Sequence, residues 1–143
     1  MAGEEPISVS DTLSVEDQHG LDDLLDRHNV EHTGIRDARL LSVTLRSVDG
    51  ELCAGLHGHT WGGCCEIKTI WVAEDRRRQG VGGRLLEAAE NEAARRGCTQ
   101  IVLTTHSFQA PEFYENRGFC RIASVDDYPK GHSHILMVKR IAG

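Results

Sequence analysis

The sequence is poor in aromatic residues and in proline, with 5% Phe, Trp and Tyr together and three prolines in 143 residues. It has no apolar run long enough to span a membrane, and its first residues, MAGEEPISVS, lack both the basic and the apolar segment of a secretion signal. We therefore expect a cytoplasmic protein that makes no contact with a membrane. The length favours a single domain over residues 1–143, large enough to bury its own core.

Positive charge is also scarce. The chain has 16 lysines and arginines against 22 aspartates and glutamates, which gives a formal net charge of −6 at pH 7. A general electrostatic attraction to nucleic acid or to an anionic membrane is therefore disfavoured. The three consecutive arginines at 76–78 must then serve a local purpose rather than form part of a basic face.

Paired cysteines are missing. The five cysteines form an odd set without a CxxC spacing, which favours reduced thiols and no disulfide. An alternative is a metal site that combines His57, His59 and Cys64, but nothing nearby completes a spacing of metal ligands. We expect no metal.

One extended piece and one helix are expected before the main sheet. Residues 7–10 have an extended pattern, and Ser14 with Asp17 three residues later favours a capped helix that ends near 32–34. The apolar side of this helix consists of Leu21, Leu24 and Leu25.

Strands and helices alternate in the rest of the chain. Three strand-like runs lie between 38 and 72, separated by the turn pairs Asp49-Gly50 and Gly62-Gly63. The elements expected after them are a helix at 81–96, a buried strand at 100–105, a short helix at 110–117 and two strands at 119–125 and 134–141. The fold class predicted from this order is mixed α/β, with a mostly antiparallel seven-strand sheet and helices on both faces.

A glycine-rich turn with flanking arginines, RRRQGVGGRLL, lies at 76–86, where a strand ends and a helix begins. The start of a helix has unpaired N–H groups and the positive end of the helix dipole, so it attracts phosphate. Glycines let a ligand approach those amides, and arginines add charged hydrogen bonds. We predict a diphosphate-binding site. The dinucleotide fingerprint is incomplete, because Leu85 stands where glycine or alanine is needed, and the GK[ST] ending of a Walker P-loop is absent.

The motif Arg77-x-x-Gly80-x-Gly82, followed by RLLEAAE and by FYENRGF at 113–119, closely resembles the GNAT superfamily of acyl-CoA-dependent N-acyltransferases. The similarity extends from about residue 40 to 141. It implies that acetyl-CoA is the acyl donor, that the turn at 77–83 holds its pyrophosphate and that the backbone at 70–72 holds its pantetheine arm. The cofactor-binding residues implied in this way are Ile70, Trp71, Val72, Arg77, Arg78, Gln79, Gly80, Val81, Gly82, Gly83, Arg84, Ser107 and Tyr114.

The same resemblance suggests two catalytic residues. Transfer to an amine needs a base, since a protonated amine has no lone pair, and Glu66 stands where some family members carry a glutamate that acts through water. Tyr114 stands where the family has a tyrosine beside the cofactor sulfur, able to protonate the departing thiolate. The alternatives are a solvent-facing Glu66 paired with a cation on a neighbouring strand, and a Tyr114 that only packs in the core. Ser107 replaces an asparagine that many relatives have seven residues before the tyrosine.

Loops at strand ends supply the candidate acceptor site: His106, Phe108, Asp126, Asp127 and Tyr128. Two acids and aromatic rings suit a cationic amine, His106 is an alternative base, and a solvated turn is the alternative interpretation. We expect direct transfer in a ternary complex to a small-molecule primary amine, with antibiotics among the candidates.

Other interpretations remain open. They are acetylation of a protein or peptide amine, a non-catalytic acyl-CoA sensor, and a covalent route through Cys64, Cys65 or Cys120. We expect no nucleic-acid partner, and the exposed edges of an open sheet favour a homodimer.

Overall fold

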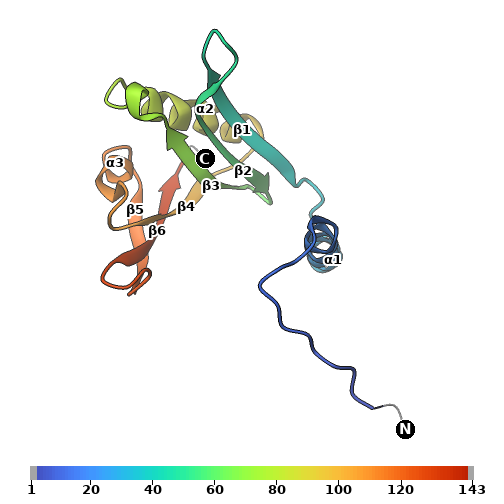
Figure 1. Ribbon diagram of the computed structural model, residues 1–143. Coiled ribbons are helices and arrows are strands. Elements are labelled where there is room, and N and C mark those ends of the chain that lie inside the picture. The colour runs from blue at the N-terminus through green and yellow to red at the C-terminus, as the bar shows by residue number, and fades with distance from the viewer. Residues whose placement is uncertain (1–2, 142–143) are drawn as a thin grey trace. The chain divides into compact units, whose positions relative to one another are not determined.

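The structure is a computed structural model that describes residues 3–141, and it divides into two compact units (Figure 1). One unit ends at Ile35 and the other begins at Arg36. The single domain over residues 1–143 stays a prediction. Among the described residues, no helix is both long and apolar enough to cross a membrane.

The first unit contains helix α1, Val15–Thr33. Its start is capped as predicted, because the Ser14 hydroxyl accepts a hydrogen bond from the Asp17 N–H at 3.0 Å. Its end is set by Gly34, which has a φ of 72° and donates its N–H to the Val30 carbonyl. Taken by itself, a lone helix has no partner within its unit on which to bury its leucines.

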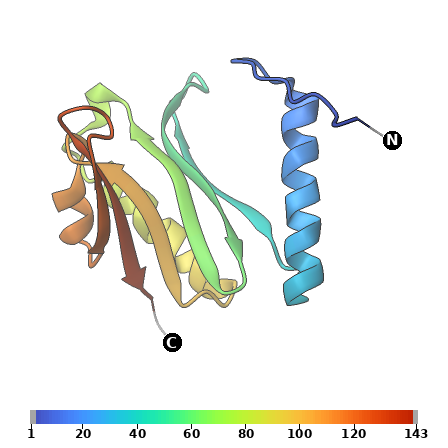
Figure 2. The same ribbon diagram turned by 90° about the horizontal axis from the view of Figure 1, so that it is seen from below.

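The second unit contains a six-stranded sheet in the order β1-β2-β3-β4-β6-β5. Its strands are β1 (Arg39–Arg46), β2 (Leu52–Trp61), β3 (Cys64–Val72), β4 (Gln100–His106), β5 (Cys120–Asp126) and β6 (Ser133–Arg140). All neighbouring pairs are antiparallel except β3 and β4, and Figure 2 shows β4 between β3 and β6. The mixed, mostly antiparallel class is confirmed. The sheet has six strands and not the predicted seven, because the extended segment at 7–10 has no ladder partner and its Ile7 and Val9 are exposed.

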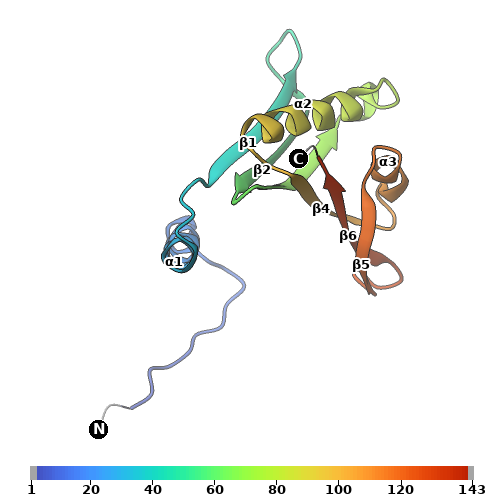
Figure 3. The same ribbon diagram turned by 180° about the vertical axis from the view of Figure 1, so that it is seen from behind.

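Helix α2, Val81–Arg95, covers β1, β2 and β3 on one side, as Figure 3 shows. The apolar positions predicted for this helix are confirmed as core: Val81, Leu85, Leu86, Ala89 and Ala93 are all buried. They pack against strand residues such as Leu41, Ile67 and Met137. Two short helical segments complete the unit, η1 (Glu74–Arg76) and α3 (Pro111–Glu115).

The parallel strands β3 and β4 pair only over their first halves. Their register runs from Cys64 opposite Gln100 to Ile67 opposite Leu103, yet β3 continues to Val72. On the other side of β3, a bulge interrupts the pairing with β2, because the consecutive residues His57 and Gly58 pair with Thr69 and Ile67. Lys68 is thus an extra, bulged residue of β3, and a Cβ at Gly58 would lie 2.9 Å from the Ile67 Cα. A bulge bends its strand, so we attribute the divergence of β3 from β4 to this irregularity.

Candidate active site

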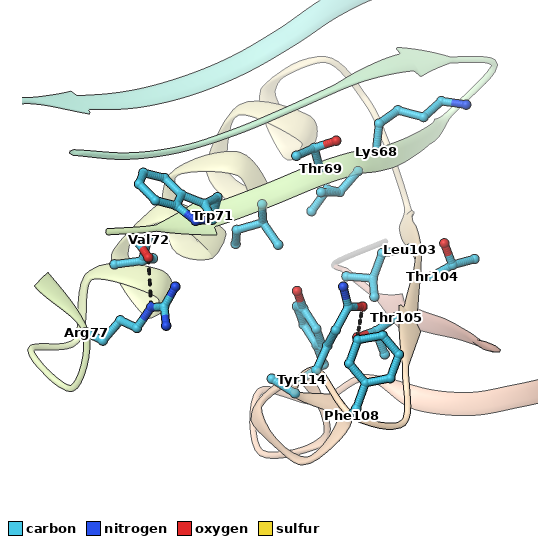
Figure 4. A pocket seen from close by; sticks show the side chains of 14 residues that line it. Lys68, Thr69, Trp71, Val72, Arg77, Leu103, Thr104, Thr105, Phe108 and Tyr114 are labelled. Carbon is cyan, nitrogen blue, oxygen red and sulfur yellow. Dashed lines mark hydrogen bonds between the residues drawn. The ribbon is translucent and has the colours of Figure 1, made fainter. Parts of the chain in front are cut away.

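The divergence of β3 and β4 opens a cleft of about 660 Å³ (Figure 4). A second hollow of about 580 Å³ adjoins it at the start of α2 and shares part of its wall. The shared residues are Ile70, Trp71, Val72, Arg77, Ala110 and Tyr114. The two hollows therefore form one continuous groove, which we call the transfer cleft.

One end of the transfer cleft is the start of α2. The first helical hydrogen bond runs from the Arg84 N–H to the Gly80 carbonyl, so the N–H groups of Val81, Gly82 and Gly83 have no helical acceptor. Within the described chain no side chain caps this helix, and its first turn contains no acidic residue. An uncapped helix start without a carboxylate is suited to an external anion.

Arginines surround this helix start. The hollow there is lined by Arg76, Arg77, Arg78 and Arg117. Arg77 is fixed by a hydrogen bond from its Nε to the Val72 carbonyl at 2.9 Å, which leaves its other nitrogens for a ligand. Arg78 has a φ of 63°, in the left-handed region that non-glycine residues seldom adopt. The three arginines at 76–78 therefore lie together at the helix start.

The glycines of the turn meet different structural requirements, either a positive φ angle or a close contact. A Cβ at Gly80 would meet nothing within 4 Å, but its φ of 77° favours glycine. A Cβ at Gly82 would lie 3.1 Å from the Phe113 ring, and one at Gly83 would overlap the Arg117 guanidinium. The expectation that Gly82 and Gly83 simply clear space for a ligand is therefore incomplete, because they also admit the close approach of α3 and the residues after it.

The wall of the cleft along β3 is a strand edge. In the described part of the chain, residues 68–72 have no strand partner on the β4 side, so their backbone groups face the cleft. Across from them, the Gln109 side-chain oxygen accepts hydrogen bonds from the His106 N–H at 2.8 Å and the Thr105 hydroxyl at 3.2 Å. This fixes the carboxamide at the cleft wall. The predicted backbone site at Ile70–Val72 is available for a ligand that pairs like a strand.

Tyr114 lies where the two hollows meet, on α3. Tyr114 is only 6% exposed, and its ring makes T-shaped contacts with those of Phe113 and Phe119. Figure 4 shows the side chain directed into the cleft, and among residues 3–141 the hydroxyl has no hydrogen-bond partner, although it is not a fully buried atom. Burial raises the pKa of the phenol above its ordinary value of 10.0. At neutral pH the phenol is therefore protonated.

Glu66 lies on β3 but does not line the cleft. Its carboxylate forms an ion pair with Lys68, with Nζ and Oε2 2.7 Å apart and both side chains around half-exposed. The cation expected on a neighbouring strand is thus on the same strand, two residues away. Lys68 does line the cleft, so the Glu66 carboxylate is paired with a residue of the lining. A general-base role for Glu66 stays a prediction.

Three predicted cofactor residues are not brought to the cleft. Gln79 donates its side-chain N–H to the Asp75 carbonyl, and Arg84 is exposed on α2 away from the lining. The Ser107 hydroxyl accepts the Ser133 N–H at 2.9 Å, joining β4 to β6. The structure adds Lys68, Gln109 and Arg117, which sequence reasoning missed. Of these three residues, only Arg117 could have been found from the sequence, because it belongs to the FYENRGF motif.

The predicted acceptor residues divide into two sets. His106 and Phe108 stack with their ring centroids 5.3 Å apart, and Phe108 lines the cleft. Asp126 accepts a hydrogen bond from Ser133 at 3.3 Å, and Asp127 accepts one from the Gly131 N–H at 3.2 Å. The two acids thus stabilise the turn between β5 and β6, which agrees with the alternative interpretation of that segment.

The cysteines are poor candidates for a covalent nucleophile. Burial raises the pKa of Cys64, Cys65 and Cys98, to about 11 for Cys65. The further cause is a neighbouring thiol for Cys64 and Cys65, and the Asp37 carboxylate for Cys98. A thiolate is therefore rare at neutral pH. Cys120 is exposed on β5, and neither it nor Cys64 nor Cys65 lines the cleft. Within residues 3–141, no three His, Cys, Asp or Glu side chains are grouped to hold a metal, so His57, His59 and Cys64 do not form such a group.

Comparison with known proteins gives a consistent result. Residues 8–119 match the model of the acetyltransferase (GNAT) family. Acetyltransferase Atu2258 of Agrobacterium fabrum (strain C58) is 34% identical over 132 residues, covering 92% of this chain and 96% of that protein. Blasticidin-S acetyltransferase of Streptomyces morookaense is 39% identical over 116 residues, covering 78% and 85%. A crystal structure of an acetyltransferase from Agrobacterium tumefaciens matches with a TM-score of 0.88 at 33% identity, covering 96% and 100%.

Proposed function

Because this chain belongs to the acetyltransferase (GNAT) family and is an N-acetyltransferase, we propose that it transfers the acetyl group of acetyl-CoA to a primary amine of a small molecule, directly and in a ternary complex. One observation carries the proposal. The transfer cleft joins an uncapped helix start lined by arginines to the free hydroxyl of Tyr114. One end suits a pyrophosphate and the other suits a group-transfer reaction.

The residues of the transfer cleft fit acetyl-CoA, which supplies an activated acetyl thioester when it is bound. The N–H groups of Val81, Gly82 and Gly83 and the side chains of Arg77 and Arg78 would hold the pyrophosphate. The free edge of β3 at 68–72 would pair with the amide-containing arm as a strand does. The Gln109 carboxamide has its oxygen occupied, so its NH₂ group offers a further donor at the wall.

Two side chains would take part in the proton transfers of the reaction, one as acceptor and one as donor. Glu66 would accept, through water, the proton that the amine loses. Tyr114 would donate the proton that the leaving sulfur requires, since its phenol is protonated at neutral pH and its hydroxyl is free. The weak thiolate character of the buried cysteines supports direct transfer over a covalent cysteine route.

The acceptor class is supported by a relative. Blasticidin-S acetyltransferase covers 78% of this chain in the alignment, and by name it acts on an antibiotic. We propose that the acceptor here is likewise a small molecule, with an amine-bearing antibiotic as one candidate. Acetylation of a protein or peptide amine is the competing class.

The test is release of free thiol from acetyl-CoA in the presence of a panel of amines. The panel contains simple amines, polyamines, amine-bearing antibiotics and peptides with a free N-terminus or lysine. We expect amine-dependent thiol release with a small-molecule amine, and acetylated product by mass spectrometry. A sensor module would bind acetyl-CoA and release no thiol with any amine, which would contradict the proposal.

Arg78→Glu should weaken acetyl-CoA binding by about tenfold to a hundredfold, because it places a negative charge at the anion site. Arg78 is exposed, so the fold should be retained, and Arg78→Asn should have a smaller effect because asparagine tolerates the left-handed backbone. Isothermal calorimetry measures the affinity. Arg140→Glu, an exposed arginine at the end of β6, makes the same charge change outside the cleft. Equal losses in Arg78→Glu and Arg140→Glu would show a general charge effect and remove the anion site.

We also propose a cytoplasmic homodimer without a nucleic-acid or membrane partner. The five free cysteines support the cytoplasmic location, and the net charge of −6 supports the absence of a nucleic-acid partner. The dimer is supported by the open edge of the sheet at β5, whose seven residues are all exposed, including Ile122 and Val125. Light scattering after size exclusion should give a mass of about twice 15.8 kDa. A mass that stays at that of one chain at micromolar concentration would contradict the dimer.

A further inference from the structure

Five aromatic rings gather beside the transfer cleft, at the end of β4, in the turn between β5 and β6, and at the start of β6. They are His106, Phe108, Tyr128, His132 and His134, and we call them the ring cluster. Phe108 is 55% exposed and Tyr128 is 54% exposed, so the cluster is not part of the core. Exposed aromatic surface of this kind in a chain that is poor in aromatic residues calls for a binding partner.

Three of these rings form a stack. His106 is in the middle, with the Phe108 ring at 5.3 Å and 10° to its plane, and the His134 ring at 4.6 Å and 23°. Such near-parallel separations are typical of offset stacking. Phe108 is the ring of this stack that lines the cleft, and it is 55% exposed although His106 and His132 both contact it.

The stack is held in place before any ligand arrives. The His106 Nδ1 lies 3.0 Å from the Tyr128 carbonyl oxygen, which can only accept, so Nδ1 carries the proton and donates it. The Tyr128 ring is tilted against the rings of His106 and His134. The His132 ring makes a T-shaped contact with Phe108, with the two centroids 4.9 Å apart. A ring whose plane is fixed in the free protein binds a flat partner at a lower entropic cost.

Phe108 connects this stack to the reaction site. It lines the same cleft as Tyr114, and Figure 4 shows both side chains at the cleft with Thr105 nearby. Phe108 is 55% exposed and lines the cleft, so part of its surface is available there. The two acids of the neighbouring turn each accept one hydrogen bond within that turn, whereas Phe108 is the ring of the cluster that lines the cleft.

We infer that Phe108 is a stacking site for a planar conjugated ring carried by the amine acceptor, which would extend the stack of His134, His106 and Phe108 by one ring. This inference rests on the proposed function, because it concerns the acceptor of the same cleft. It names the substrate class more narrowly as amines attached to an aromatic or heteroaromatic ring.

The test compares benzylamine with cyclohexylmethylamine, which have the same carbon skeleton but differ in planarity. Because the two amines also differ in basicity, the quantity to compare is the change in their kcat/KM ratio upon substitution. Phe108→Leu keeps an apolar side chain and removes the ring, so the ratio of benzylamine to cyclohexylmethylamine should fall by about twofold to tenfold, mainly through KM of benzylamine. Phe108→Tyr keeps the ring and should keep the ratio, as should Val48→Ala, an exposed apolar residue in a turn remote in sequence.

A second measurement does not depend on turnover. Ligand-observed NMR on the CoA-loaded protein should show benzylamine binding that weakens in Phe108→Leu and persists in Phe108→Tyr. If both amines are acetylated and Phe108→Leu leaves their ratio unchanged, the stacking site is overturned while the proposed function stands. If no amine is acetylated but ring binding depends on Phe108, the stacking site stands and the proposed function fails. If no amine is acetylated and ring binding does not depend on Phe108, both the stacking site and the proposed function are overturned.

Discussion

Tyr114→Phe should lower kcat by about tenfold to a thousandfold, while acetyl-CoA affinity and melting temperature stay close to those of the parent. The substitution removes only the hydroxyl. That hydroxyl has no hydrogen-bond partner among the described residues, so its loss should cost little stability, and the ring contacts with Phe113 and Phe119 remain. Steady-state kinetics and thermal unfolding on the same preparation measure both quantities.

The matched control is Phe119→Leu, which disturbs the packing of the same ring and keeps the hydroxyl. Phe119 is buried with its ring 5.9 Å from that of Tyr114, so this variant should melt at a lower temperature with a near-normal rate per folded molecule. If Tyr114→Phe shows this same pattern of full activity at reduced stability, Tyr114 is a structural residue and not the proton donor.

The pH dependence adds a second criterion for Tyr114. Burial raises the pKa of its phenol above 10.0, so the group stays protonated as pH rises through the whole neutral and mildly alkaline range. The rate defect of Tyr114→Phe should therefore be nearly constant with pH below about 10. A defect that disappears between neutral pH and pH 9 would contradict a donor role.

Glu66→Gln should lower kcat by about a hundredfold near neutral pH and leave acetyl-CoA affinity unchanged. At neutral pH most of the amine is an ammonium ion, and glutamine cannot accept its proton. As pH rises, a larger share of the amine is already deprotonated in solution, so the defect should shrink. The full pH profile of kcat and kcat/KM is the measurement.

Lys68→Met is the matched control for Glu66. It breaks the same 2.7 Å ion pair but keeps the carboxylate, and the pair contributes little stability because both side chains are substantially exposed. If Glu66 only pairs with Lys68, the two variants should have equally small effects. An unchanged rate and pH profile in Glu66→Gln would exclude Glu66 as the base and leave His106 or a chain of water molecules as the next candidates.

The sequence predicted correctly those features that depend only on residues close together in the chain. The Ser14 cap and the left-handed Gly34 stop of α1 depend on side chains and backbone angles within a few residues. The same holds for the start of α2, where Gly80 adopts a φ of 77° and the uncapped N–H groups follow from helix geometry. The extended pattern at 7–10 misled because a strand also needs a partner, and its own residues do not specify one.

The position of the cleft depends on pairing between distant residues. The cleft opens because β3 separates from β4 after Ile67, beside a bulge in the pairing of β3 with β2 at Gly58. A strand register is set by contacts across the sheet, so the pattern of β3 alone does not indicate where its edge becomes free. For the same reason sequence reasoning missed Gln109, which is fixed by hydrogen bonds at the end of β4.

By itself, the sequence determined the helices, the six strands of the sheet, the glycine-rich start of α2 and the placement of Tyr114 in a recognisable motif, since each rests on residues close together in the chain. Only the tertiary structure decided which side chains share the cleft. It brought Arg117 to the helix start, left Glu66 outside the lining but paired with Lys68, and excluded Ser107 and Arg84 from the lining. It also assembled the ring cluster from two segments more than twenty positions apart, because strands β4 and β6 are neighbours in the sheet.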